Sequence, residues 1–300
     1  MVISFHLVYI ECLYPYAKQV VYTFHIPAFL IISGYLMNKD KEPKTFWHSL
    51  LWLVIPYLVM ESGYVMMAAV LPINEHIKTL SGAVFLDKLL FHPIGPYWYL
   101  HTLIQCEAVF YYAMRVKSFS RFSRFIMVSL LLYIMADAFT ILSFTSATYF
   151  LAGAILRLSG MSIVTVCKPS LLALIAFALF VGKSHNLNAS TITGAMIVYM
   201  SMSGCMLFYM HAGVIIRSAL LFFGRNTLPL YLFSPMFTIL CKPMAAVIAF
   251  DPTGISFLLF ALTTCITGSL LIAIIMDKTG LSRLMFGKTR VFHPFPTVYF

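Results

Sequence analysis

Long apolar segments fill most of this 300-residue chain, and their length restricts the fold more than any other feature. Ten segments approach the ~20 residues that a helix rising ~1.5 Å per residue needs to cross a ~30 Å hydrocarbon core. They are residues 1–14, 20–37, 46–72, 97–116, 125–143, 145–159, 166–182, 190–210, 226–241 and 254–276. Helices satisfy backbone hydrogen bonds within one segment, as lipid requires. The sequence therefore predicts an all-α membrane bundle of about ten spans, the first of them truncated.

The composition favours a membrane over water as the solvent. Hydrophobic residues make up 61% of the chain and charged residues only 10%, against ~25% charged residues in soluble domains. A net charge of +10 favours nucleic-acid binding only where basic residues gather on one face, and here they are scattered between apolar runs. We therefore predict membrane lipid as the surroundings and no nucleic-acid partner.

Lysine and arginine residues are unevenly distributed between the two sets of connections. Fifteen of the 20 follow the even-numbered segments or lie in the tail, and five lie in the opposite set. Because cytoplasmic connections carry the positive excess, this distribution predicts that both termini are cytoplasmic. It also predicts one integral-membrane domain over residues 1–300, ending in a cytoplasmic basic tail, residues 277–300.

The longest extracytoplasmic connection is residues 73–96. Its apolar residues recur at helical spacing, which is typical of an amphipathic helix lying at the membrane interface. A loop with a few anchoring apolar side chains explains the same pattern, and both alternatives stay open.

Two histidines lie inside apolar segments, where ionisable groups are costly and tend to face an interior or a cavity. His6 lies about eight residues before the end of the first segment, and His25 about five residues after the start of the second. If these segments are antiparallel neighbours, both imidazoles lie at a similar depth. An imidazole pair can exchange a proton with an alcohol, but spacing alone favours hydrogen bonding between helices without chemistry.

Glu61 follows Pro56-Tyr57, where a proline-opened backbone near a carboxylate favours a polar cavity or a partner on another helix. The six cysteines are far apart, and no Cys, His or acidic residues have the spacing of metal ligands. The sequence therefore predicts no metal site.

Several motifs resemble those of acyltransferase family 3, especially its integral-membrane carbohydrate O-acetyltransferases of the fucose-4-O-acetylase-like branch. The most specific is residues 24–36, Phe-His-Ile-Pro-Ala-Phe-Leu-Ile-Ile-Ser-Gly-Tyr-Leu. Further similar motifs, in the family's order, are Ile55-Pro56-Tyr57, Tyr97-Trp98-Tyr99-Leu100, Tyr149-Phe150-Leu151-Ala152-Gly153 and the segment 224–232.

This resemblance implies a multi-pass enzyme of the bacterial inner membrane. It implies transfer of an acetyl group from acetyl-CoA to a hydroxyl of a cell-surface polysaccharide or its lipid-linked precursor. His6 occupies the place of the histidine that ends the family's Arg-x10-His pattern, so the arginine would fall before Met1. We therefore expect His6 and His25 to be catalytic and the first helix to be shortened.

An acceptor and a donor substrate, as the resemblance implies, each need binding residues. Ser33, Glu61, Trp98 and Asn226 are the candidates for the acceptor substrate, although the position of Trp98 is explained more simply by an interfacial aromatic belt. Lys39, Lys41, Lys44 and Arg157 are candidates for the phosphates of coenzyme A because they lie at the expected cytoplasmic ends, where ordinary positive-inside residues would look the same.

Two other functions fit these features. A transporter or flippase of a polar solute would use the same intramembrane His, Glu and Asp residues as a proton relay. A shortened and inactive copy of the enzyme would keep the motifs without the activity.

Overall fold

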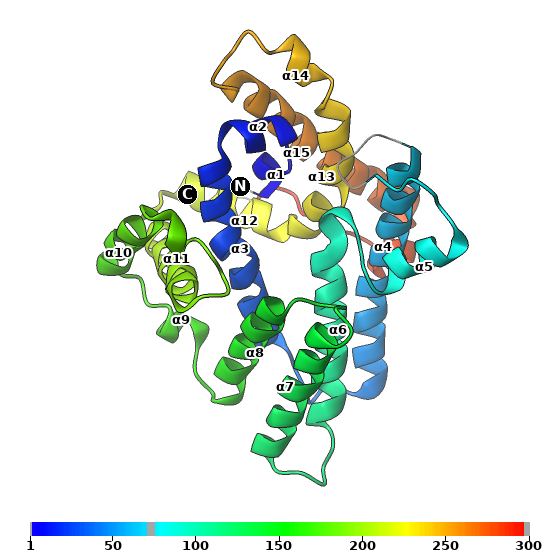
Figure 1. The fold of residues 1–300 in the computed structure, drawn as a ribbon, viewed down its shortest axis with the longest axis vertical. Helices are drawn as coiled ribbons and strands as arrows, with labels where there is room; N and C mark the ends of the chain where they lie inside the picture. The colour runs from blue at the N-terminus through cyan, green and yellow to red at the C-terminus, as the bar shows by residue number, and fades with distance from the viewer. Residues whose placement is uncertain (1, 71–75, 297–300) are drawn as a thin grey trace. The chain divides into compact units, whose positions relative to one another are not determined.

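The computed structural model describes residues 2–70 and 76–296, and in these ranges the chain is helical, with no strand (Figure 1). The chain divides into two compact units, one formed by Met1–His25 with Cys167–Phe300 and the other by Ile26–Val166. Helix α3, Pro15–Leu36, contributes its first half to the former unit and its second half to the latter. We call them the terminal unit and the middle unit.

The middle unit contains the end of α3 and a group of helices packed around Phe46, Phe110 and Phe150. Its elements are α4 Pro43–Val70, α5 Gly82–Leu90, η1 Gly95–Tyr97, α6 Trp98–Met114, α7 Arg121–Asp137, α8 Phe144–Leu158 and α9 Ile163–Val166.

The terminal unit joins the two ends of the chain. Its helices before α3 are α1 Val2–Phe5 and α2 Val8–Leu13. The later elements are α10 Leu171–Val181, η2 Ser184–Asn186, α11 Ile192–His211, α12 Val214–Arg225, α13 Thr227–Cys241, α14 Met244–Val247, α15 Ile255–Thr279 and α16 Leu281–Phe286. Helices α13 and α15 are packed together in this unit.

Four described helices are long and apolar enough to cross a membrane: α3, α4, α11 and α15. Three shorter apolar helices, α8, α10 and α13, fall on further predicted segments. The expected first span, residues 1–14, differs, because the chain leaves the helical conformation at His6 and Leu7 and forms α1 and α2 instead. The structure confirms an all-helical chain with membrane-spanning character, while the count of ten spans stays a prediction.

The connection after α4 contains a short helix, α5, which is one of the two alternatives left open by the sequence. The Ser81 side chain accepts a hydrogen bond from the Val84 amide and caps α5 at its first turn. No residue of α5 is buried, and Leu86 and Leu90 are exposed. This exposed apolar surface on a short helix fits a position at the membrane interface.

A side-chain bridge follows α5. The His92 Nδ1 donates to Asp87 Oδ1 at 2.8 Å, and its Nε2 lies 3.2 Å from Thr140 Oγ1 in the connection between α7 and α8. The hydrogen bond from His92 lowers the pKa of the Asp87 carboxyl, because it stabilises the ionised form.

The bridge should therefore weaken in acid. The pKa of Asp87 is lower in the folded protein than in the unfolded chain, where it has the ordinary aspartate value of about 4. Ionised Asp87 therefore stabilises the fold above about pH 4, and this contribution is lost as the pH falls through the lower, folded-state pKa. We expect amide exchange in residues 87–92, corrected for intrinsic rates, to accelerate below about pH 4 in the wild type. Asp87→Asn should show fast exchange that does not change with pH, and an identical pH response in both proteins would contradict the assignment.

Candidate functional site

The two predicted catalytic histidines lie together in the terminal unit. The ring centroid of His6 is 6.3 Å from that of Tyr22, and the Tyr22 centroid is 5.2 Å from that of His25, both in edge-to-face geometry. Both imidazoles therefore contact the same tyrosine. His25 is buried at 7% exposure and His6 is half-buried.

The break after α1 explains how His6 reaches this position. Leu7 has an extended backbone and is 2% exposed, packed with Ile10, Phe257 and Ala261. Burial of Leu7 in this cluster fixes the chain where the helix is interrupted, and His6 is the residue before it. Packing of an apolar residue thus positions the imidazole next to Tyr22.

The hydrogen bond of His25 fixes its tautomer. Its Nδ1 lies 2.8 Å from the carbonyl oxygen of Val21, which can only accept. Nδ1 therefore carries the proton, and Nε2 of the neutral ring has a free lone pair. This is the form of imidazole that accepts a proton from a hydroxyl group.

A charged pair adjoins the imidazoles. Lys18 forms an ion pair with Glu11, and its Nζ lies 5.3 Å from the centroid of the Tyr22 ring. Sequence reasoning missed Tyr22 and Lys18 as parts of this cluster. Their signal was available, since Lys18, Tyr22 and His25 are spaced by four and three residues and so share one face of α3.

A polar cavity lies in the middle unit at the end of α3. It has a volume of about 240 Å³ and is lined by Ser33, Leu36, Met37, Asn38, Lys41, Phe46 and Glu107. The Ser33 hydroxyl lies 3.1 Å from the Tyr99 hydroxyl. The cavity thus combines an apolar wall with a hydroxyl, an amide, an ammonium group and a carboxylate.

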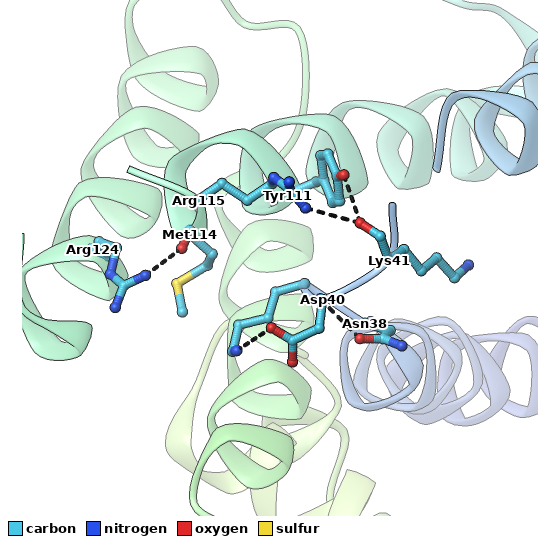
Figure 2. Close-up of polar contacts among 8 residues, drawn as sticks. Asn38, Asp40, Lys41, Tyr111, Met114, Arg115 and Arg124 are labelled. Carbon is cyan, nitrogen blue, oxygen red and sulfur yellow. Dashed lines mark hydrogen bonds and ion pairs between the residues drawn. The ribbon is translucent and has the colours of Figure 1, made fainter. Parts of the chain in front are cut away.

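The loop between α3 and α4 is held in place from α6 (Figure 2). The carbonyl oxygen of Lys41 accepts hydrogen bonds from Tyr111 Oη at 2.8 Å and from Arg115 Nη1 at 2.9 Å. Phe46 stacks on the Tyr111 ring with centroids 3.7 Å apart. These contacts fix the backbone that presents Lys41 to the cavity.

The four predicted phosphate-binding cations have different environments. Lys39 Nζ lies 2.6 Å from Asp40 Oδ1, which neutralises it locally. Lys41 lines the cavity, Lys44 is exposed, and the Arg157 guanidinium stands 5.7 Å above the Tyr35 ring. Lys41 and Glu107 lie on the cavity wall, and no ion pair joins them among the described contacts.

Glu61 is fully buried and holds the turn after α5. Its Oε1 accepts from the Ile94 amide at 2.7 Å, while Tyr57 Oη donates to the Leu89 carbonyl at 2.8 Å. His101 Nε2 makes a similar contact, at 2.9 Å, with the Leu90 carbonyl. Three polar side chains of α4 and α6 thus satisfy backbone groups at the end of α5 and in the turn after it.

Glu61→Ala should lower the free energy of unfolding by about 1–3 kcal/mol, because the amide of Ile94 loses its acceptor. Glu61→Gln keeps an acceptor oxygen and should cost clearly less. Thermal unfolding in detergent compares the two variants at equal purity. Equal stability of alanine, glutamine and wild type would show that the contact contributes nothing.

The other two predicted acceptor residues have separate positions. Trp98 is half-buried at the first position of α6. Asn226, between α12 and α13, is fully buried, and its amide bonds the backbone of His293 in both directions, at 2.8 and 2.9 Å. Neither residue lines the cavity that contains Ser33.

Among the described residues, no group of three or more His, Cys, Asp or Glu side chains has the arrangement of a metal site. Apolar helices of membrane-spanning length and buried imidazole and carboxylate groups define the described chain as an all-helical membrane protein with acid–base side chains in its interior.

Comparison with known proteins identifies the family. The model of acyltransferase family 3, described as an acyltransferase domain, matches residues 1–274, and the chain belongs to this family. This confirms the family indicated by the motifs and assigns the chain to the membrane acyltransferases. Searches of curated proteins and of solved structures found no match.

Proposed function

We propose that this protein transfers an acetyl group from acetyl-CoA to a hydroxyl of a cell-surface polysaccharide, or of its lipid-linked precursor, at the bacterial inner membrane. Family membership supports acyl transfer. The observation that carries the proposal is the contact of His6 and His25 with one tyrosine ring, which gathers acid–base groups within an apolar chain. Imidazole is the side chain best suited to move a hydroxyl proton near neutral pH.

Acyl transfer to a hydroxyl group requires removal of the hydroxyl proton, and we propose that the two imidazoles carry out this proton transfer. A ring nitrogen of His6, with His25 Nε2 sharing the proton, accepts the proton of the acceptor hydroxyl as its oxygen attacks the thioester carbonyl. The new C–O bond forms and the C–S bond breaks. The leaving thiolate takes up the same proton, so both imidazoles return to the neutral state.

For the donor, we propose that the middle-unit cavity and the cations near it bind part of the coenzyme. The cavity of about 240 Å³ is below the ~300–1,000 Å³ of sites for whole drug-sized ligands, so it holds only a segment of acetyl-CoA. Lys41, Lys44 and Arg157 are the proposed phosphate contacts, and Lys39 contributes less because Asp40 pairs with it.

For the acceptor, we propose Ser33 and Trp98 as direct contacts. Glu61 and Asn226 bond backbone groups, and we infer that they act by positioning the turn after α5 and the C-terminal segment. The positive excess on one set of connections supports cytoplasmic termini and about ten spans.

Isotope-labelled acetyl-CoA tests the proposal. Membranes containing the full chain are incubated with acceptor glycan, and mass spectrometry follows the label into glycan ester. We expect label in the glycan only when the protein is present. Proton-coupled solute uptake without labelled glycan would instead identify a transporter, and neither activity at normal protein level would identify an inactive copy.

A further inference from the structure

The C-terminal segment lies outside the matched acyltransferase domain, yet it is fastened to the terminal unit. We call α16 and residues 287–296 the C-terminal strap. The Asp277 carboxylate, near the end of α15, accepts hydrogen bonds from Ser282 Oγ at 2.5 Å, the Val291 amide at 2.9 Å and the Phe292 amide at 3.0 Å. The carboxylate of half-buried Asp277 therefore ties both parts of the strap, α16 and the segment after it, to α15.

A second attachment holds the last described residues of the strap, around His293 and Phe295, to α12 and the residue after it. The Asn226 side chain bonds the backbone of His293 in both directions, and the Phe222 ring lies 5.4 Å from that of Phe295. Val291 is buried at 6% exposure. These contacts give the strap a fixed conformation rather than that of a free tail.

The outer surface of the strap and the adjoining helix end combines positive charge with apolar side chains. Lys278, Arg283, Lys288 and Arg290 are all exposed. Leu281, Leu284 and Phe295 are 48%, 73% and 51% exposed. Residues 278–296 contain no Asp or Glu, and the three hydrogen bonds to Asp277 occupy the nearest carboxylate.

The length of α15 places this surface at the membrane boundary. Its 25 residues span about 37 Å at ~1.5 Å per residue, against a hydrocarbon core of ~30 Å. The end of the helix therefore reaches the headgroup level. Gly280, with a positive φ of 78°, then turns the chain into α16.

We propose that the C-terminal strap is a binding surface for anionic phospholipids, with its cations on the headgroup phosphates and its exposed apolar side chains among the acyl chains. Charge complementarity selects anionic over zwitterionic lipid, since each cation near a negative membrane surface contributes about fivefold in affinity. The exposed leucines and phenylalanine select lipid over a soluble anion, which offers them no apolar partner. This proposal is independent of the acyl-transfer reaction.

Native mass spectrometry of the full chain in detergent tests the proposal with phosphatidylglycerol and phosphatidylcholine as probes. We expect tighter retention of phosphatidylglycerol by the wild type. The variant K278Q/R283Q/K288Q/R290Q should lose at least about 100-fold of that affinity and bind phosphatidylcholine as before. The milder K288Q/R290Q removes two of these four exposed cations and should lose at least about 10-fold.

A charge-matched control distinguishes a local surface from general attraction. K117Q/R121Q/K168Q/K183Q removes four exposed cations outside the strap and should retain phosphatidylglycerol. Asp277→Ala keeps every cation but removes the carboxylate that holds the strap. It should therefore weaken phosphatidylglycerol binding, although the loss of a negative charge makes the protein more positive. Equal losses in the strap and control variants, undiminished binding by Asp277→Ala, or displacement by inorganic phosphate at equimolar concentration would each overturn the proposal.

Discussion

Alanine at position 25 is expected to lower the rate of acetyl transfer by at least about 100-fold, the lower end of what general acid–base catalysis supplies. His25 is buried, and its hydrogen bond to Val21 leaves Nε2 as a proton acceptor. His6→Ala should have a similar effect. If the two imidazoles share one proton, the double variant should lose little more than either single variant.

His211 provides a matched control in the same unit. Its Nδ1 also lies close to the carbonyl four residues earlier, at 3.0 Å from Leu207, but the residue is exposed at the end of α11. His211→Ala should leave transfer unchanged. Each variant is measured against its protein level in the membrane, because a smaller side chain at a buried position also lowers stability. Full activity of both His6→Ala and His25→Ala would disprove the proposed mechanism.

Sequence reasoning located most helices because apolar length is a local property of the chain. Segments 20–37 and 254–276, for example, correspond to α3 and α15 with ends shifted by five residues or fewer. The break in residues 1–14 was not predictable in this way. No proline or glycine marks it, and it depends on burial of Leu7 against Phe257, which lies far along the chain.

In the candidate site too, local features were predictable from the sequence and contacts between distant residues were not. His6 and His25 were recognisable because titratable residues are rare in apolar segments, and Tyr22 and Lys18 lie on the same helix at regular spacing. The partners of Glu61 and Asn226 were not recognisable, because they are the backbone groups of Ile94 and His293. Backbone groups carry no sequence signature, so polar side chains that brace a turn look like candidates for substrate binding.

Replacement of Gly34 or Gly153 by alanine is expected to destabilise the middle unit by about 3 kcal/mol, the upper end of the usual cost, since added atoms at a close-packed contact force backbone shifts. A β-carbon on Gly34 would overlap the carbonyl oxygen of Phe150, and one on Gly153 would overlap the carbonyl oxygen of Ile31. Helices α3 and α8 therefore meet backbone to backbone, as membrane helices do at paired small residues. This contact gives a physical reason for the glycines in two of the motifs similar to those of the family, residues 24–36 and 149–153.

Gly63 in α4 is the control position, because a β-carbon there would meet no atom within 4 Å and alanine should not destabilise the protein. Gly63→Ala should stabilise the protein by about 0.5–1 kcal/mol through its effect on helix propensity. Thermal unfolding in detergent, followed by tryptophan fluorescence, compares the three variants. The double variant of Gly34 and Gly153 should cost less than the sum of the single effects, since one displaced contact already separates α3 from α8. Wild-type stability of Gly34→Ala and Gly153→Ala would show that the helices do not cross at these residues.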